Sequence, residues 1–506
     1  MSLPIWLEPL YTAQEMRDTD RWAIEERGVP SMELMEHAGA AVAREVAGLR
    51  PDGPVVFVCG KGNNGGDGFV AGRLLRAAGR EVRVLLAGDA EGIRGDAAEA
   101  LRRLGLPPDP FVPEALEHAA VAVDALLGTG STGAPRGAVA EAIDALGRAG
   151  APVVAVDVPS GVDASTGEVA GPAVQADLTV TFHAAKPGLW IAPGKEHAGE
   201  VRVADIGIPS GAPVESTIGL IHDEVLIGLP RRLAPGTKFT SGHVLVCGGS
   251  TGLTGAPCMA AEAAMRAGAG YVTACVPASL NAIFEVKLTE VMTRPLPDED
   301  GALMPPAAQT VLGEAERRGG SLVLGPGMGR AEPTVALIHD LAARAPGALV
   351  IDADGLNAHA GELERLRGRG APTVLTPHGG ELARLLETDS AAVNARRLHH
   401  AREAARISGA IVVLKGDDTL VAEPEGRVGV SPGGASGLAT AGTGDVLSGV
   451  LAAMLAKGLE PFTAACAGVL LHVRAGRLAA ERQGGPGGVV ATDVIHALPT
   501  SLGSVG

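Results

Sequence analysis

The chain has 506 residues, which exceeds the usual size of one hydrophobic core, so at least two domains are expected. It carries 42 basic and 58 acidic residues, and the resulting net charge of −16 disfavours nucleic acid and anionic membranes as partners. Hydrophobic residues make up 46% of the chain but aromatic residues only 2%, which indicates folded domains with aliphatic cores. The five cysteines show no metal-ligand spacing, and charges interrupt the long apolar stretches. We therefore expect a cytoplasmic enzyme.

The first half alternates short β-branched runs with longer segments of helical period, as βα units of a mainly parallel sheet do. Ahead of these runs, Ser31 is placed to cap a helix whose apolar residues recur on one face as far as Leu49. The predicted strands of this half are 55–58, 82–86, 121–123, 153–156 and 178–182.

A segment rich in proline and glycine, 208–236, interrupts this alternation and predicts a boundary between two domains, 1–222 and 223–506. Beyond it the strand pattern resumes, and a long helical segment begins at Asp445. The predicted strands of the second half are 244–247, 272–276, 322–324, 349–351, 373–375 and 411–414. The tail 498–506 is expected to be disordered.

A glycine-rich loop, Gly60–Gly68, follows the first predicted strand and opens a helix. The backbone N–H groups of such a loop at a helix N-terminus favour binding of an anion. Because the loop satisfies G-x-G-x-x-G, an ordinary dinucleotide-binding fold with Asp89 as the ribose partner is one alternative. A tight turn with Asp67 as a helix cap is another.

Polar residues follow two further strands of the first half. Asp124 lies at the end of one, and Asp157 and Ser160 follow the next. An unpaired buried carboxylate is costly, so a cation or a hydrogen-bonding ligand should face these residues. A hard cation requires several oxygens from separate segments, and this set supplies them.

The motifs at 62–68, 124–130, 156–163 and 204–209, with the opening MELMEHAG at 32–39, resemble those of the NAD(P)H-hydrate epimerase family. The resemblance implies a potassium ion held by Asn64, Asp124 and Ser160. It also implies that the damaged nucleotide is bound by Asn63, Asn64, Gly65, Gly66, Asp67, Gly128, Thr129, Gly130, Ser131, Thr132, Gly133, Ala134 and Asp157. Epimerisation needs a carboxylate near the ring as acid or base, for which Asp157 is the first candidate and Asp124 the second.

In the second half, Ala441–Gly449 places two glycines around Thr443 at a helix start, with Asp445 directly after them. Such amides can hold a transferring phosphoryl group while Asp445 accepts a hydroxyl proton. A helix N-terminus weakens a carboxylate as a base, but phosphoryl transfer depends more on positioning than on base strength. The alternative is a glycine-rich turn in which Asp445 only caps the helix.

This motif resembles those of ribokinase-like small-molecule kinases. Together with Lys238, 243–250, 254–257, 325–329, 352–357, 376–381 and 415–416, it resembles the ADP-dependent NAD(P)H-hydrate dehydratase family. The resemblance implies that the hydrated nucleotide contacts Ala256, Gly329, His378 and Asp445. It implies that ADP, or ATP, is held with magnesium by Lys415, Gly416, Asp417, Asp418, Thr419 and Gly444.

The chain departs from the family patterns at a few positions. Lys61 and Gly379 stand where the families have proline, which changes the rigidity expected of those loops. Asp417 and Asp418 replace small residues and are expected to add negative charge near a nucleotide phosphate. A basic run, 396–406, is interpreted as a solvated helix face.

Taken together, the sequence predicts an α/β protein of two three-layer αβα domains with mainly parallel sheets, the first Rossmann-like and the second ribokinase-like. The expected activity is epimerisation of hydrated NADH and NADPH, followed by ADP-dependent dehydration of the S form. The chain is expected to be a homo-oligomer. The alternative is a ribokinase-like small-molecule kinase whose first half binds a nucleotide without catalysis.

Overall fold

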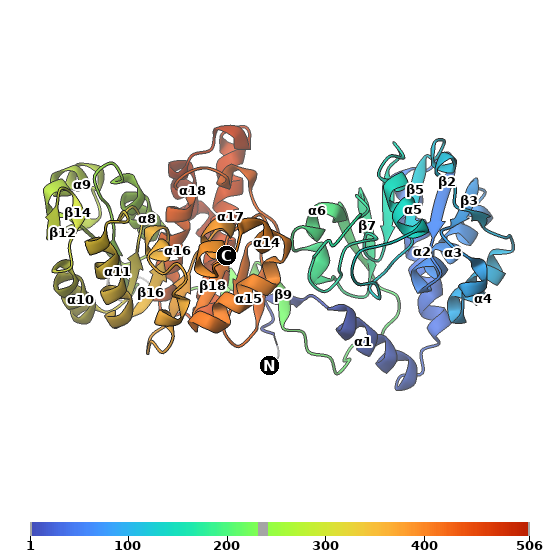
Figure 1. Cartoon of the computed structure of the whole chain (residues 1–506), viewed down its shortest axis with the longest axis horizontal. Helices are drawn as coiled ribbons and strands as arrows, with labels where there is room; N and C mark the ends of the chain where they lie inside the picture. The colour runs from blue at the N-terminus through green and yellow to red at the C-terminus, as the bar shows by residue number, and fades with distance from the viewer. Residues whose placement is uncertain (1–2, 231–240, 504–506) are drawn as a thin grey trace. The chain divides into compact units, whose positions relative to one another are not determined.

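The computed structural model describes residues 3–230 and 241–503, which form two compact units (Figure 1). The first unit is chiefly Pro9–Ile218, and the second joins Pro4–Glu8 to the chain from Gly219 onward. No helix within these described ranges is long and apolar enough to cross a membrane.

The first unit contains a seven-stranded parallel sheet in the order β4-β3-β2-β5-β6-β7-β8. Its strands are β2 (Val55–Cys59), β3 (Val82–Leu86), β4 (Asp109–Pro110), β5 (Val121–Ala125), β6 (Val153–Val156), β7 (Leu178–Phe182) and β8 (Glu200–Ala204). All five strands predicted for this half are present. The two edge strands, β4 and β8, were not predicted.

Helices cover both faces of this sheet. Successive side chains of a strand point to opposite faces, and in the central strand β2 both sets are apolar, so each face needs a covering layer. Val55 and Phe57 join the core beneath one group of helices, whereas Val56 and Val58 pack against Ile143 of a helix on the other face. The first group is α2 (Ser31–Leu49), α3 (Asn63–Ala77) and α4 (Gly95–Leu104), and the other helix is α5 (Ala138–Leu146). This is the predicted three-layer arrangement.

Two further α-helices of the first unit are α1 (Ala13–Glu25) and α6 (Gly194–Ala198). Thr12 caps α1, and its hydroxyl accepts a hydrogen bond from the Glu15 amide. Ser31, predicted as the cap of α2, is instead the first residue of that helix, and Pro30 precedes it without a side-chain bond.

The second unit contains an eleven-stranded sheet in the order β1-β9-β20-β19-β18-β17-β16-β15-β10-β11-β12. The run from β18 to β12 is parallel, and β19 and β20 continue it as antiparallel strands. The strands are β1 (Leu7–Pro9), β9 (Ile218–Ile221), β10 (His243–Cys247), β11 (Tyr271–Pro277), β12 (Met292–Leu296), β15 (Ser321–Leu324), β16 (Ala348–Ile351), β17 (Thr373–Leu375), β18 (Ile411–Leu414), β19 (Leu420–Ala422) and β20 (Val428–Val430). A small hairpin pairs β13 (Asp298–Glu299) with β14 (Ala302–Leu303).

The central strands of this sheet are buried throughout, as expected when helices cover both faces. Four helices pack together: α8 (Gly255–Arg266), α16 (Thr443–Ala456), α17 (Pro461–Arg482) and α18 (Ala491–Gly503). The others are α7 (Glu224–Ile227), α9 (Asn281–Lys287), α10 (Ala307–Arg318), α11 (Glu332–Arg344), α12 (Asp354–Asn357), α13 (Gly379–Leu385), α14 (Ser390–Ala395) and α15 (Arg397–Ser408). The α/β class with mainly parallel sheets is therefore confirmed.

Three sequence expectations differ from this fold. Disorder of the tail is wrong as far as residue 503, because Leu498 and Ser501 are buried on α18. Pro4–Glu8, assigned by sequence to the first domain, belong to the second unit, because β1 pairs with β9. The boundary segment itself contains β9 and α7.

The strand order locates one switch point in each sheet. From β2 the chain builds outward through β3 to β4, and it then returns to the other side of β2 with β5. The second sheet reverses in the same way between β10 and β15. Ligands of open α/β sheets bind outside the carboxyl ends of the strands at such points. The Gly60 loop and Asp124 lie at the first switch point.

Close contact between α8 and α16 requires a glycine. A Cβ on Gly449 would lie 2.0 Å from the Ala260 carbonyl oxygen. We expect Gly449→Ala to lower the unfolding free energy of the second unit by about 1–3 kcal/mol, because helix backbones must separate. Gly313→Ala is the control on α10, where a Cβ meets nothing within 4 Å, and it should stabilise by about 0.5–1 kcal/mol. Thermal melts of both variants check the opposite signs, and equal shifts would contradict the packing argument.

Candidate functional sites

The Gly60 loop of the first unit is shaped by close backbone packing. A Cβ on Gly60 would lie 2.0 Å from the Leu126 carbonyl oxygen, and one on Gly65 would lie 2.1 Å from the Gly60 oxygen. Helix α3 begins at Asn63 with Gly62 as its cap. Asp67 is therefore buried inside the helix, and the alternative that Asp67 only caps it is wrong.

A second cluster surrounds Asp124, which is fully buried at the end of β5. Its carboxylate accepts hydrogen bonds from the Ser160 hydroxyl at 2.7 Å and the Ser160 amide at 2.8 Å. The Ser160 hydroxyl also lies 3.3 Å from the Leu127 carbonyl oxygen, to which the Asn64 side chain donates at 2.9 Å. Asn64, Asp124 and Ser160, predicted as one set, are thus brought together.

Burial raises the pKa of Asp124 to about 6, although the Ser160 and Leu126 hydrogen bonds oppose the shift. Among the residues that the structure describes, no lysine or arginine forms an ion pair with this carboxylate. A buried carboxylate without a counter-charge, surrounded by amide, hydroxyl and carbonyl oxygens, is a chemical environment that suits a monovalent cation.

Asp157 follows β6 in an unusual backbone conformation, with a φ of 65°. One carboxylate oxygen accepts a hydrogen bond from Lys186 Nζ at 2.8 Å, and the other lies 3.4 Å from the Thr129 amide. Thr129 belongs to the predicted nucleotide loop 128–134, which is exposed from residue 132 to residue 134. The loop and Asp157 therefore lie side by side.

The sequence did not single out Lys186 or Asp20, and the structure adds both to this site. Lys186 is 1% exposed and holds Asp157. Burial raises the pKa of Asp20 to about 6, and the nearby Asp157 raises it further while Lys186 opposes the shift. Lys186 follows a predicted strand within four residues, so the strand-end rule that identified Asp157 was sufficient to find it. Asp20, on an amphipathic helix, carried no such signal.

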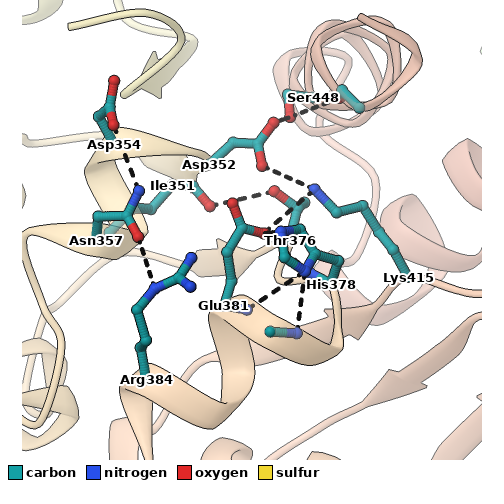
Figure 2. Close-up of polar contacts among 12 residues, drawn as sticks. Ile351, Asp352, Asp354, Asn357, Thr376, His378, Glu381, Arg384, Lys415 and Ser448 are labelled. Carbon is teal, nitrogen blue, oxygen red and sulfur yellow. Dashed lines mark hydrogen bonds and ion pairs between the residues drawn. The ribbon is translucent and has the colours of Figure 1, made fainter. Parts of the chain in front are cut away.

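The corresponding edge of the second unit centres on Asp352, which is 2% exposed and follows β16 (Figure 2). Ser448 of α16 donates to Asp352 Oδ2 at 2.7 Å, and Lys415 donates to Oδ1 at 3.1 Å. Lys415 Nζ also lies 3.7 Å from Glu381 Oε2. Carboxylates from the end of β16 and from α13 therefore meet at Lys415, which itself follows β18, while α16 holds Asp352 through Ser448.

Asp445 lies in the first turn of α16, directly after Gly444. Burial raises the pKa of Asp445 to about 7, and Asp352 raises it further while Lys415 opposes the shift. A Cβ on Gly444 would lie 3.4 Å from Lys415 Nζ, so the start of α16 lies beside this lysine. Gly442, with a φ of 90°, is the residue that precedes the helix as its cap. The arrangement provides a carboxylate poised to exchange a proton near neutral pH, beside free helix amides.

His378 caps α13 and leaves its ring partly open. Its Nδ1 accepts a hydrogen bond from the Gly380 amide at 3.0 Å, and Glu381 accepts one from the His378 amide at 2.9 Å. The side chain is 56% exposed. On the other side of Asp352, the Gly329 amide donates to Asp354 at 2.9 Å. Both predicted residues therefore lie in loops that follow strands of the same sheet.

Ala256 is the second residue of α8, and a Cβ on Gly327 would lie 3.5 Å from its side chain. It therefore lies at the second switch point, beside the loop that follows β15. Lys238, part of the sequence motif, lies outside the described residues.

The loop 415–419 corrects two expectations about charge. Arg397, expected on a solvated face, is 6% exposed and bonds Asp418 Oδ2 at 2.9 Å. The Asp418 charge is therefore matched by a buried guanidinium and is not directed at a phosphate. Asp417 accepts a hydrogen bond from the Gly434 amide at 2.8 Å. Both acids stabilise the loop, in which the Thr419 hydroxyl donates to the Gly416 carbonyl at 2.7 Å.

Two family models match the chain. The NAD(P)H-hydrate dehydratase family matches residues 244–500, and the family described as YjeF-related protein N-terminus matches residues 31–188. These ranges contain the second and first edge sites, respectively.

Curated relatives match over almost their whole length. The bifunctional NAD(P)H-hydrate repair enzyme Nnr of Moorella thermoacetica is 42% identical, covering 97% of this chain and 96% of that protein. The Salinibacter ruber enzyme of the same name is 41% identical, covering 97% and 95%. A solved Bacillus subtilis ADP/ATP-dependent NAD(P)H-hydrate dehydratase is 26% identical, covers 56% of this chain and 97% of its own, and has a TM-score of 0.47. The chain therefore belongs to the bifunctional NAD(P)H-hydrate repair enzymes, and the family predicted from its motifs is confirmed.

Proposed function

We propose that the two sheet edges divide the repair of hydrated NADH and NADPH between them. The first edge interconverts the R and S hydrates, and the second dehydrates the S hydrate with ADP, or ATP, as phosphoryl donor. The observation that carries this division is the placement of Asp445: a carboxylate with a pKa of about 7 at the start of α16, beside Lys415.

In the second unit, Asp445 accepts the proton of the ring hydroxyl as that oxygen attacks the terminal phosphate. A phosphate ester is a far better leaving group than hydroxide, so elimination then restores the double bond of NAD(P)H. The amides at the start of α16 stabilise the charge on the transferring group. Ala256, Gly329 and His378 line the side on which the hydrated ring binds.

The nucleotide is held by the loop Lys415–Thr419 and by Gly444. Lys415 supplies a buried positive charge, and the Arg397–Asp418 pair fixes the loop that carries it. Magnesium, when bound, neutralises phosphate charge, and the carboxylate oxygens near Lys415 are donors of the type that it prefers. Glu381 would hold it together with the nucleotide phosphates.

In the first unit, Asn63–Asp67, the loop 128–134 and Asp157 bind the hydrate. Epimerisation breaks the ring C–O bond, releases water, and adds water back to the opposite face, with carboxylates moving the protons. A bound potassium ion would supply the positive charge that the buried Asp124 carboxylate lacks. Asn64, Asp124 and Ser160 would hold it, which fits the uncompensated buried charge of Asp124.

Incubation of the chain with both epimers tests this division. Without ADP, a mixture enriched in either epimer should relax to the same ratio with no gain in NADH absorbance. With ADP and magnesium, both epimers should disappear as NADH and phosphate form. Disappearance of the S epimer alone would show that the first edge is inactive. Accumulation of a stable phosphate ester would show that the second edge is an ordinary kinase.

The dehydration rate should depend on the ionisation of Asp445. As a base this carboxylate must be ionised, so kcat/KM should fall tenfold per pH unit below about pH 7 and level off above it. In Asp352→Asn the loss of a neighbouring negative charge should move this midpoint to lower pH. A midpoint that came from ionisation of ADP would stay where it is in this variant. Rates across pH 5 to 9 check both; a midpoint that is the same in the two proteins would contradict the role of Asp445.

A further inference from the structure

The loop after β16 carries a second acidic residue, Asp354, whose contacts the proposed reaction does not use. Asp354 is the first residue of α12, two residues after Asp352. Its Oδ2 accepts the Gly329 amide at 2.9 Å. Its Oδ1 lies 3.4 Å from Arg330 Nε and 3.3 Å from Asn357 Nδ2. Asp354 therefore joins the loop after β15 to the loop after β16.

The same line of contacts continues to α13 (Figure 2). Asn357 Oδ1 accepts a hydrogen bond from Arg384 Nε at 3.0 Å. Arg384 lies on α13, the helix that His378 caps. The contacts therefore run from the loop of Gly329 to the helix of His378, the two residues proposed above to line the side on which the ring binds.

An arginine stands at each end of this line, with its terminal N–H groups available to a ligand. Arg330 and Arg384 are exposed, and each uses its inner Nε in the local contact. Among residues 3–230 and 241–503, none accepts a hydrogen bond from the Nη groups of either arginine. A guanidinium presents a planar fork of N–H donors that matches two oxygens of a phosphate. The two side chains are therefore suited to an anionic ligand.

The line of contacts lies close to the reacting group of the second unit. Asp354 contributes to the raised pKa of Asp445, so the two carboxylates are near enough to interact. In a nicotinamide dinucleotide the ring nitrogen carries a ribose, and that ribose carries the pyrophosphate. The 2′-phosphate of NADPH is on the other ribose, farther from the ring. The anionic group that first follows the ring is therefore the pyrophosphate.

We propose that Arg330 and Arg384 bind the pyrophosphate of the hydrated dinucleotide, and that Asn357 is a positioning residue that orients Arg384. This inference rests on the dehydratase site proposed above. The pyrophosphate is common to the hydrates of NADH and NADPH, and dehydration does not change it. The two arginines therefore stabilise the bound substrate and the transition state equally, and they determine affinity for the dinucleotide without altering the rate of the chemical step.

The test is steady-state dehydration of the pure S hydrates of NADH and NADPH by Arg330→Met and Arg384→Met. Each variant should raise KM about tenfold for both hydrates, because a charge-assisted hydrogen bond to phosphate is lost. The values of kcat and of KM for ADP should not change. Arg384→Lys keeps the charge without the fork and should recover part of the affinity. Asn357→Ala releases Arg384 and should raise KM by a smaller factor, again at constant kcat.

Arg344→Met is the matched control. Arg344 is also exposed and paired with a carboxylate, but it lies in the last turn of α11, and its loss should leave both KM values unchanged. A rise in KM for the NADPH hydrate alone would assign the arginines to the 2′-phosphate, and a rise in KM for ADP would assign them to the donor.

Either of those results would overturn the proposal, as would unchanged KM values or a fall in kcat alone. If Arg384→Met does not fold, Arg330→Met decides by the same criteria. Absence of dehydration by the unmodified chain would instead refute the proposed function.

Discussion

Asp445→Asn is expected to lower kcat for dehydration by about 10³-fold, because the amide cannot accept the hydroxyl proton. The substitution is nearly isosteric and lies in the first turn of α16, so the fold should be retained. The measurement is NADH formation from pure S hydrate with ADP and magnesium. Binding of ADP, measured by calorimetry, should remain.

Epimerisation by the same variant provides an internal control. Asp445→Asn should interconvert the R and S hydrates at the rate of the unmodified chain. The mirror variant, Asp157→Asn, should slow interconversion and leave dehydration unchanged. Retention of dehydration in Asp445→Asn would rule out this residue as the base.

Arg397→Met should have the largest effect on stability. It leaves the Asp418 carboxylate, which is 3% exposed, without its cation. Removing one partner of a buried pair costs about 3–5 kcal/mol, which lowers the melting temperature of a domain of this size by roughly 10 °C. Arg397 also donates to the Lys415 carbonyl at 3.3 Å, so the affinity for ADP should fall as well. Calorimetric melts and ADP titration measure the two effects.

Two further variants separate charge from size in that experiment. The double variant Arg397→Met with Asp418→Leu removes both charges and should recover most of the lost stability. Arg344→Met breaks an exposed pair with Asp340 and should change stability by less than about 1 kcal/mol. If Arg397→Met lowered the unfolding free energy no more than Arg344→Met, the buried Asp418 carboxylate would not need Arg397 as its counter-charge.

Sequence predicted the central strands of both sheets because each is a short β-branched run that is buried on both faces, as Val153–Val156 illustrates. It did not predict the edges. The strand Glu200–Ala204 has exposed charged residues at alternate positions, and Leu7–Pro9 is three residues long with a partner strand some 210 residues away. Such pairing depends on tertiary contacts that a local pattern does not contain.

The site residues divide in the same way, into those that a local sequence pattern identifies and those that depend on tertiary contacts. Asp124, Asp157 and Asp445 were identifiable because each lies at a strand end or a helix start, where polar groups reach a ligand. Arg397 was misinterpreted because a basic run is ordinarily solvated, and its partner Asp418 is distant in sequence. Asp20 required the fold, since its importance comes from lying in the same charge environment as Asp157 and Lys186.

From Pro4 onward the polypeptide passes between the two units twice, once near Glu8 and once near Ile218, and β1 pairs with β9 in the second unit. In topological terms the epimerase is an insertion into the dehydratase and not a module attached to its front. A fragment beginning at residue 223 would lose both strands and expose β20 as a new edge, which invites aggregation. An excised dehydratase should therefore carry residues 4–8 joined by a short linker to Gly219.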